Sequence, residues 1–373
     1  MPYKLLVIPN DPLYKYYEKG EIKTRYWNPC NIFHEIHIIS LCGEDIDPYY
    51  IQTVFGDAKA VVHTIGKPKI YNYFLWKNKV KKIALEVNPD VIRVHNTQIG
   101  GWIGVKIGQK LEIPTMVSLH ASYDEARAFY KRRGDKKNYI KQTILRYLTE
   151  VFVIKNATAI YCVYPNIFPY LNRNKRKDYS LIYNRVYAQD FPRKANHASN
   201  KLKILTVGRL NEHKNIDVII KSIQNTNYNL TVIGKGEEEQ KLKTMVKDLN
   251  LEQQVTFISS IKNKDIANYY HTHDIFAMAM EAEGVSIPVI EAMACGMPII
   301  VPEHIQDEID APLVYVKINP NDFHRVYKKF EDIKKRIKHG DANHKAFLKI
   351  EGNKMEEKEA ELYVKIISKK IKK

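Results

Sequence analysis

Cysteines are few in this sequence, and long hydrophobic runs are missing from it. The 4 cysteines, Cys30, Cys42, Cys162 and Cys295, form no CxxC pair and stand at no zinc-like spacing from histidine, so neither a disulfide framework nor a metal site is indicated. No window approaches the roughly 18 consecutive apolar residues that a membrane span needs, and the first residues turn polar too soon for a signal peptide. We therefore expect reduced, buried thiols in a cytoplasmic protein.

Glycine and proline are also sparse, at 16 residues each among 373, which excludes collagen-like and low-complexity chains. Apolar residues make up 45% of the sequence and charged residues 27%, values that are ordinary for globular proteins. The length exceeds the roughly 250 to 300 residues at which a single hydrophobic core stops growing. The chain should therefore fold into two domains of ordinary size.

Positive charge outweighs negative charge, and the excess is concentrated in the first half. Residues 1–200 hold 31 Lys and Arg against 17 Asp and Glu, a net charge of +14, whereas residues 201–373 hold 28 against 25, a net charge of +3. Such a field attracts anionic partners, which admits nucleic acid, an acidic membrane face or a phosphorylated acceptor. A general contribution to solubility is the alternative interpretation.

Short apolar segments rich in β-branched residues alternate with stretches of helical periodicity. Residues 71–87 and 100–111 have the spacing of amphipathic helices, and Pro89 and Pro114 follow them as stop signals. This alternation predicts βαβ repetition, and hence an α/β fold with two doubly wound, Rossmann-like parallel sheets. The expected strands lie at residues 4–8, 36–40, 60–63, 91–94, 115–119 and 159–163, and again at 203–207, 230–233, 255–258, 274–279, 299–301 and 313–316.

The hydrophobic pattern lapses into small polar residues at 194–200 and then restarts, which places a domain boundary there. We predict an N-terminal domain at 1–195, a C-terminal domain at 196–352 and a terminal helix at 353–373 that packs back across the first domain. Ligands of open α/β sheets bind at the carboxyl ends of the strands, so the two domains should face each other across a ligand-binding cleft. The apolar stripe expected on the terminal helix consists of Leu362, Val364, Ile366 and Ile367.

Two cations follow the strand expected at residues 203–207. In the segment Gly208–Asn215 (GRLNEHKN), Arg209 and Lys214 stand in a loop that leaves a strand and enters a helix. Such a pair can neutralise a diphosphate, because Arg offers a planar fork of donors and Lys a point charge. A solvated basic loop is the alternative interpretation.

A second motif at residues 281–298 (EAEGVSIPVIEAMACGMP) predicts a short helix with Ser286 as N-cap and Pro288 in the first turn. Free N–H groups at the start of this helix would favour a phosphate. Glu283 and Glu291 lie on the expected ligand side, and carboxylates accept hydrogen bonds from a cis-diol, so one could hold a ribose and the other a sugar ring. The alternatives are a solvated charge for Glu283 and a helix-dipole contact for Glu291.

Together these segments resemble the donor-binding signature of the retaining family 4 glycosyltransferases, which have the GT-B fold. Glu283 and Glu291 match the Glu-x7-Glu element of that family, and the segments around Gly234 (VIGKG) and Ile258 (VTFI) agree with it in order. The resemblance implies transfer of a hexose, with retention, from a nucleotide-diphosphate sugar such as a UDP- or GDP-sugar to a hydroxyl of a glycan or glycolipid. It implies neither a metal ion nor a cofactor besides the donor, and it makes the first domain the acceptor-binding one.

Carried over residue by residue, the resemblance implies that Arg209 and Lys214 bind the donor diphosphate, that Glu291 binds the ribose and that Glu283 contacts the transferred sugar. His120, in the segment SLHAS, is similar to a family histidine that lines the cleft for donor sugar and acceptor, and His95 is a weaker candidate. The predicted donor contacts are Arg209, Lys214, Gly234, Ile258, Glu283, Gly284, Val285, Ser286 and Glu291, and the predicted catalytic residues are His120, Glu283, Arg209 and Lys214.

Two features depart from the family pattern. Gly284-Val285-Ser286 stands where many members have Gly-Phe-Gly, which leaves the donor sugar open. The first strand is followed by Pro9-Asn10-Asp11-Pro12 and an aromatic, charged segment up to Asn28 instead of a glycine-rich loop, and we expect this segment to shape the acceptor site.

The densest basic run, residues 127–141 (RAFYKRRGDKKNYIK), follows His120 and has aromatic residues among its cations. Such a run can lie on anionic lipid headgroups, which would make the protein peripheral at the inner membrane face. Nucleic-acid phosphates and a solvated helix face are alternatives, so a DNA-modifying glycosyltransferase and a non-catalytic nucleic-acid-binding protein stay open. The cations predicted to face the acceptor or membrane are Arg127, Lys131, Arg132, Arg133, Lys136 and Lys137.

Overall fold

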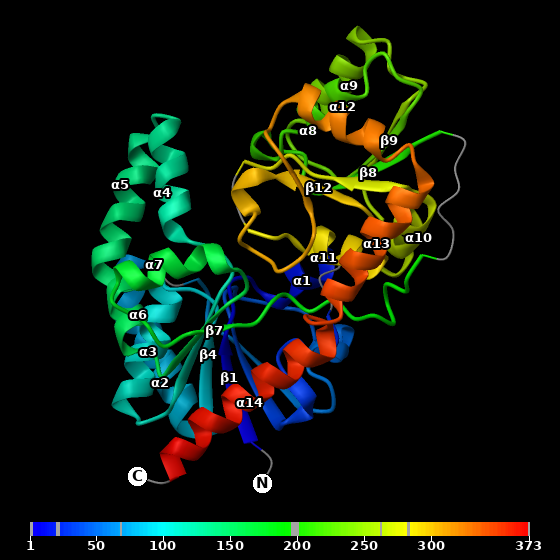
Figure 1. The fold of residues 1–373 in the computed structure, drawn as a ribbon. Coiled ribbons are helices and arrows are strands. Elements are labelled where there is room, and N and C mark those ends of the chain that lie inside the picture. The colour runs from blue at the N-terminus through cyan, green and yellow to red at the C-terminus, as the bar shows by residue number, and fades with distance from the viewer. Residues whose placement is uncertain are drawn as a thin grey trace. The chain divides into compact units, whose positions relative to one another are not determined.

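A computed structural model describes residues 3–19, 23–67, 69–194, 201–261, 263–281 and 284–371 of the chain. The chain divides into two compact units. Unit 1 consists of Met1–Tyr183 together with Met355–Lys373, and unit 2 of Asn184–Lys354. Each unit is built around its own parallel sheet (Figure 1).

The described part of unit 1 contains a seven-stranded parallel sheet in the order β3-β2-β1-β4-β5-β6-β7. Its central strands are buried on both faces, as expected for a parallel sheet covered by helices. The strands are β1 (Tyr3–Ile8), β2 (Phe33–Ser40), β3 (Lys59–Thr64), β4 (Val91–Val94), β5 (Thr115–Leu119), β6 (Ala159–Cys162) and β7 (Ser180–Leu181). The sequence pattern missed only β7 among these, because two residues are too short for a periodicity.

Helices and short turns connect the strands of unit 1. From β1 the sheet extends to one side through β2 and β3, and to the other side through β4 to β7. The helices predicted at 71–87 and 100–111 are α2 and α3, which pack with β1 and β4 into one hydrophobic core. The helices between β1 and β7 are α1 (Leu13–Lys19), α2 (Tyr73–Val87), α3 (Ile99–Lys110), α4 (Tyr123–Arg132), α5 (Lys136–Leu145), α6 (Val151–Asn156) and α7 (Phe168–Arg173), with short turns that include η2 (Pro48–Val54) and η4 (Arg146–Glu150).

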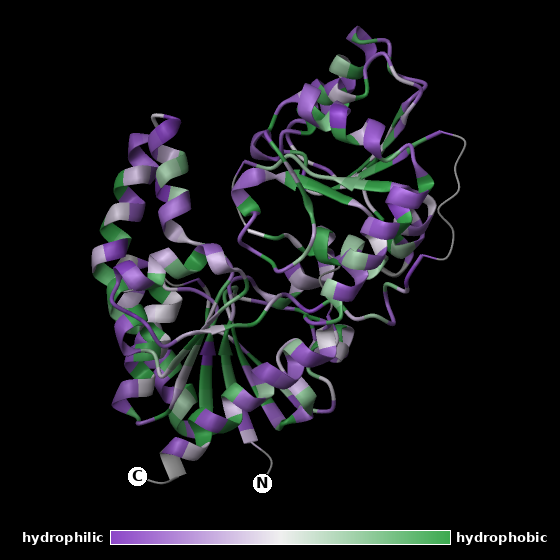
Figure 2. Ribbon diagram, viewed as in Figure 1, coloured by the Kyte–Doolittle hydropathy of each residue, from purple (hydrophilic) through white to green (hydrophobic). Residues whose placement is uncertain are grey.

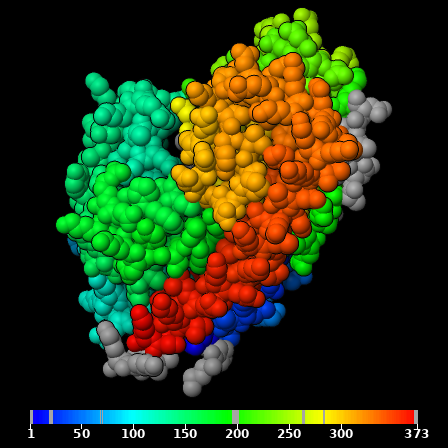
Figure 3. Space-filling view, in the orientation of Figure 1, coloured from blue at the N-terminus to red at the C-terminus, as the bar shows by residue number. Residues whose placement is uncertain are grey.

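The terminal helix α14 (Gly352–Ile371) belongs to unit 1 from Met355 onward. Its residues, red in Figure 3, lie beside the blue N-terminal residues, where Phe33 packs edge-on against Tyr363. The apolar stripe predicted for this helix is wrong in part, since Val364 is exposed. The buried face instead follows the helical spacing of three and four residues and consists of Met355, Glu356, Glu359, Ala360, Tyr363, Ile366 and Ile367.

The described part of unit 2 contains a six-stranded parallel sheet in the order β10-β9-β8-β11-β12-β13. Its strands are β8 (Lys203–Val207), β9 (Asn229–Ile233), β10 (Val255–Ile258), β11 (Ile275–Ala277), β12 (Ile299–Pro302) and β13 (Val314–Val316). Its helices are α8 (Ile216–Ser222), α9 (Glu239–Asp248), α10 (Asn263–Thr272), α11 (Ile287–Ala294), α12 (Pro320–Lys329) and α13 (Ile333–Phe347), with a short turn η6 (Glu212–Lys214). Two doubly wound parallel sheets, as predicted, are thereby confirmed.

The chain enters unit 2 earlier than residue 196. The segment after Tyr183 is already bound to unit 2, because the Gly352 N–H donates to the Val186 carbonyl at 2.8 Å and the Lys194 N–H to the Cys295 carbonyl at 2.9 Å. Residues 195–200, on which the sequence placed the boundary, lie outside the described part of the chain. A hydrophobic pattern alone cannot locate such a change, since this segment is held by main-chain hydrogen bonds.

Candidate active site

The loop after β8 brings the two predicted cations of unit 2 together. One turn of 3-10 helix, η6, follows Arg209 and ends at Lys214. Asn215 then adopts a left-handed conformation, with φ +48°, and its side-chain amide donates to the Ala279 carbonyl at 2.9 Å. The loop is therefore fixed to the segment that follows β11, and the Glu281 N–H, which donates to the His213 carbonyl at 2.8 Å, adds a second link.

A cavity of about 380 Å³ opens at this loop. Arg209 is exposed at it, whereas Lys214 is half-buried and its Nζ lies 3.8 Å from the Met280 sulfur. Two cations in one small cavity attract an anion with more than one negative oxygen. The lining residues are Val207, Gly208, Arg209, Asn211, His213, Lys214, Met278, Ser286 and Pro288, so the sequence-predicted Arg209, Lys214 and Ser286 meet here.

The start of α11 forms another wall of this cavity, and it differs from the prediction. Ser286 occupies the N-cap position, but its hydroxyl makes no cap bond and lies 3.5 Å from the Met278 sulfur. Its carbonyl accepts hydrogen bonds from the Val289 and Ile290 N–H groups, and Pro288 has no N–H. The helix start consequently offers fewer free donors than the sequence suggested. Val285 is fully buried, so its side chain faces the core.

Glu291, the predicted ribose ligand, lies one turn further along α11. The hydroxyl of Tyr270, a fully buried residue of α10, donates to the Glu291 carboxylate at 2.7 Å. Burial and the neighbouring Glu291 raise the pKa of Tyr270, so the hydroxyl keeps its proton and remains a donor. Tyr270 was missed at the sequence level, because nothing in the spacing of one buried tyrosine reveals its partner.

Close packing explains why residue 234 is a glycine. It has φ +146°, and a Cβ there would lie 1.8 Å from the carbonyl oxygen of Gly208. Its N–H donates to the carbonyl of Ile258, the half-buried last residue of β10, at 2.9 Å. The glycine thus lets the loops after β8 and β9 pass in contact. Donor contacts of Gly234 and Ile258 remain predictions.

His120 lies at the end of β5 in unit 1, on a stack of rings. Its ring packs parallel to that of His95, with centroids 6.0 Å apart, and its Nε2 lies 3.5 Å from the Tyr26 hydroxyl. His95 is buried and accepts a hydrogen bond from the Trp27 indole at 3.1 Å, which is a structural role. Burial and the charge of Arg93 lower the pKa of His120 to about 4, so its imidazole is neutral at physiological pH.

The basic run contains one residue that the prediction placed wrongly. Arg127 is buried, and its guanidinium donates to Glu150 at 2.9 Å and to Asp124 at 2.6 Å. It closes the contact of α4 with η4 and cannot face a membrane or an acceptor. The other predicted cations are exposed, namely Lys131, Arg132, Arg133, Lys136 and Lys137.

The remaining sequence predictions concern Glu283 and the cysteines. Glu283 lies outside the described residues. Of the cysteines, Cys162 and Cys295 are buried as predicted but Cys30 is exposed.

Over the described ranges, no group of three or more His, Cys, Asp or Glu side chains is placed to hold a metal ion. Among the helices described, none combines the length and the apolar composition for crossing a bilayer.

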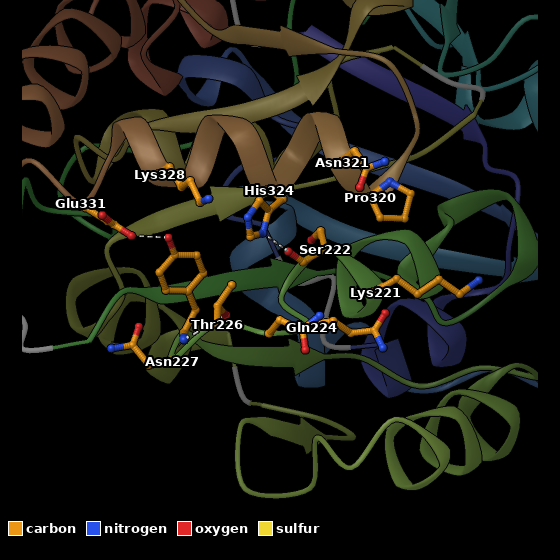
Figure 4. A pocket seen from close by; sticks show the side chains of 12 residues that line it. Lys221, Ser222, Gln224, Thr226, Asn227, Pro320, Asn321, His324, Lys328 and Glu331 are labelled. Atoms are coloured by element: carbon orange, nitrogen blue, oxygen red, sulfur yellow. Dashed lines mark hydrogen bonds between the residues drawn. The ribbon is translucent and has the colours of Figure 1, made fainter.

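A larger cavity of about 830 Å³ lies elsewhere in unit 2, between the end of α8 and helix α12. Figure 4 shows its polar lining, in which His324 meets the Ser222 carbonyl and Tyr228 donates to Glu331. None of the sequence-predicted site residues that the structure describes lines it. Size alone therefore does not mark the site, and the smaller cavity is the one that predicted site residues line.

Two family models match consecutive parts of the chain. The model described as Glycosyltransferase Family 4 matches residues 33–189, and the one described as Glycosyl transferases group 1 matches residues 188–307. A sucrose-phosphate synthase of Thermosynechococcus elongatus has a similar fold, with a TM-score of 0.76 at 15% identity over 98% of this chain and 99% of that one. The GT-B architecture predicted from the motifs is thereby confirmed.

Curated relatives resemble parts of the chain. An uncharacterized glycosyltransferase of Haemophilus influenzae is 38% identical over 26% of this chain and 28% of its own length. An O-antigen chain mannosyltransferase of Salmonella typhimurium is 30% identical over 51% of this chain and 53% of its own length. The chain thus spans between a quarter and just over half the length of these two relatives, and both are named as glycosyltransferases, the enzyme class that the sequence predicted.

Proposed function

The chain has the fold and the family signatures of GT-B glycosyltransferases, and on this premise we propose that it transfers a hexose from a nucleotide-diphosphate sugar to a hydroxyl of a glycan or lipid-linked acceptor. The observation that carries the proposal is the cavity of unit 2 in which Arg209 and Lys214 meet. The O-antigen chain mannosyltransferase among the relatives supports a glycan acceptor and a hexose donor.

Arg209 and Lys214 would bind the diphosphate and stabilise its growing negative charge as the glycosidic bond breaks. Fixed cations can do this without a metal ion, and we propose a metal-independent reaction. Glu291, oriented by the Tyr270 hydroxyl, would accept hydrogen bonds from the ribose. The donor side of the reaction would then depend on unit 2.

His120 would act on the acceptor side. A neutral imidazole can accept a hydrogen bond from an acceptor hydroxyl, and the depressed pKa keeps the ring neutral at physiological pH. We propose retention of configuration, with attack from the face that the leaving phosphate occupies. Glu283 keeps its predicted contact with the transferred sugar as part of this proposal.

We also propose that the hairpin of α4 and α5 docks on an anionic membrane face. Its exposed cations are accompanied by an apolar stripe of exposed side chains, Ile140 and Ile144 on α5 and Tyr147 and Leu148 on the adjoining turn η4. Hydrophilic and hydrophobic residues alternate along the hairpin in Figure 2. Apolar insertion together with cations is the combination that interfacial helices use, and it would place the protein at the inner membrane face.

Donor binding and product analysis test the proposed function. The whole chain should be stabilised against heat by one class of nucleoside diphosphate, since a ligand that binds only the native state raises stability. Incubation with the matching nucleotide sugar and an acceptor should give a product whose anomeric configuration, read by NMR, equals that of the donor. Inversion would contradict the retaining mechanism, and a chain unaffected by every nucleoside diphosphate would overturn the proposal.

A further inference from the structure

Three exposed tyrosines gather at the carboxyl edge of the sheet in unit 1. Tyr17 on α1 and Tyr49 and Tyr50 at the start of η2 are 51%, 80% and 62% exposed. The ring of Tyr17 lies 6.2 Å from that of Tyr50, which lies 6.3 Å from that of Tyr49. Large aromatic rings left together in solvent mark a surface that another molecule covers.

The platform formed by Tyr17, Tyr49 and Tyr50 is held in place by carboxylates of the loop after β2. Asp45 accepts hydrogen bonds from the Leu13 and Tyr14 N–H groups at 2.8 Å each and so fixes the start of α1. Asp47 accepts from the Tyr49 N–H at 2.8 Å and caps η2. Because α1 and η2 are both hydrogen-bonded to this loop, the backbone that presents the three rings is fixed before a ligand binds, which lowers the entropy cost of binding.

Aromatic contacts lead from this platform toward His120. Tyr16, the neighbour of Tyr17 on α1, packs against Trp27 with centroids 5.5 Å apart and against Tyr26 with centroids 6.5 Å apart. The Tyr26 hydroxyl is the group that lies 3.5 Å from His120 Nε2. The platform and His120 therefore lie at the same, carboxyl edge of the sheet, since α1 follows β1 and His120 follows β5.

Charge selects the class of ligand. Residues 11–19 and 41–54, which carry the platform, hold 5 Asp and Glu against 2 Lys, although the first half of the chain is strongly basic. Acidic surroundings repel nucleic-acid phosphates and anionic headgroups. A neutral sugar suits them, because its apolar ring face can stack on tyrosine while its hydroxyls donate to carboxylates.

We propose that Tyr17, Tyr49 and Tyr50 bind the sugar units already present in an uncharged saccharide acceptor, so that its terminal hydroxyl reaches His120. This inference rests on the proposed function and narrows it, since the acceptor is an oligosaccharide rather than a bare lipid or a nucleic acid. The tyrosines are binding residues that act on the acceptor alone, and donor binding does not involve them.

The test compares the double variant Tyr49→Ala/Tyr50→Ala with the control Tyr71→Ala/Phe74→Ala, which removes two similarly exposed aromatic side chains elsewhere in unit 1. Both variants and the natural chain are applied to an array of neutral mono- to hexasaccharides and to oligothymidine. We expect the natural chain and the control to retain glycans of two or more units, and the platform variant to bind them at least about fivefold more weakly.

The result that would overturn the inference is equal glycan binding by both variants, or no glycan bound by the natural chain. Loss of oligothymidine binding instead of glycan binding in the platform variant would also overturn it and would favour nucleic acid. Nucleoside diphosphate binding, measured in parallel, separates the two proposals. If nucleoside diphosphate binding persists while the platform variant binds glycans like the control, the inference about the platform is wrong but the proposed function stands. If no nucleoside diphosphate binds, the proposed function itself is wrong.

Discussion

The Arg93 guanidinium in β4 lies 2.8 Å from the Glu359 carboxylate in α14, and both side chains are buried. Arg93 also donates to the Tyr26 carbonyl at 3.1 Å and to the Tyr161 hydroxyl. The terminal helix therefore supplies the counter-ion of a cation in the core of unit 1. The same cation lowers the pKa of His120, so the end of the chain bears on the candidate acceptor site.

Removing this counter-ion should destabilise the protein. Glu359→Ala leaves Arg93 charged in a buried site, which costs about 3–5 kcal/mol in the free energy of unfolding. Urea unfolding of the whole chain measures the loss. The matched control is Glu357→Ala, an exposed glutamate of the same helix, which should stay within about 0.5 kcal/mol of the natural chain. Equal losses in the two variants would contradict a special role for the buried pair.

Neutralising the paired cations of unit 2 should weaken diphosphate binding selectively. Arg209→Gln or Lys214→Gln removes a charge-assisted hydrogen bond, so the affinity for a nucleoside diphosphate should fall about ten- to a hundredfold. The affinity for the corresponding nucleoside should hardly change. Isothermal titration with both ligands measures the difference, and Lys247→Gln, at an exposed lysine of α9, serves as control. A similar loss for nucleoside and diphosphate would exclude the assigned role.

Tyr270→Phe should impair ribose recognition without removing the carboxylate. The Glu291 carboxylate would lose the hydroxyl that orients it, and we expect about fivefold weaker nucleoside diphosphate binding. If this hydroxyl acts through Glu291, the penalty for a 2′-deoxy ligand should shrink in Tyr270→Phe and vanish in Glu291→Ala. Tyr269→Phe on the same helix is the control. An unchanged 2′-deoxy penalty in both site variants would refute ribose binding by Glu291.

Acidification should destabilise the fold through buried histidines. Burial lowers the pKa of His273 to about 4, below the roughly 6.5 of an unfolded histidine. Between these values the unfolded chain binds more protons, so the free energy of unfolding falls as the pH drops from about 6.5 to about 4. His273→Gln should flatten this slope, whereas the exposed His34→Gln should leave it unchanged. Identical slopes in the two variants would contradict the assignment.

Membrane docking should depend on the apolar stripe of the α5 region. Replacing Ile140, Ile144 and Leu148 by Ser should greatly reduce cosedimentation with anionic liposomes, because each buried aliphatic side chain contributes about 1.5–3 kcal/mol. Donor hydrolysis should be retained, since none of these residues lines the cavity of unit 2. Replacing the exposed Leu75 and Leu85 of α2 by Ser is the control. Liposome binding that survives in the stripe variant would rule out this surface.

Much of the fold was readable from the sequence. Twelve expected strands correspond to β1–β6 and β8–β13, because a buried parallel strand is a local apolar run ended by a turn. The GRLNEHKN loop and the helix after Ser286 were expected on one ligand side, and both line one cavity, since loops that follow neighbouring parallel strands open at the same sheet edge. Turn chemistry and periodicity act over a few residues, and a sequence displays them directly.

Only the tertiary structure decided which side chains are partners. In the sequence Arg127 is one more cation of a basic run, yet in the structure its guanidinium is buried in an ion pair with Glu150. Tyr270 and Glu359 carry no sequence signal for contacts with Glu291 and Arg93. Local patterning fixed the strands and motif loops of this protein, whereas the pairing of buried polar groups depended on how distant segments pack, because each such group must find its hydrogen-bond partner wherever the fold provides one.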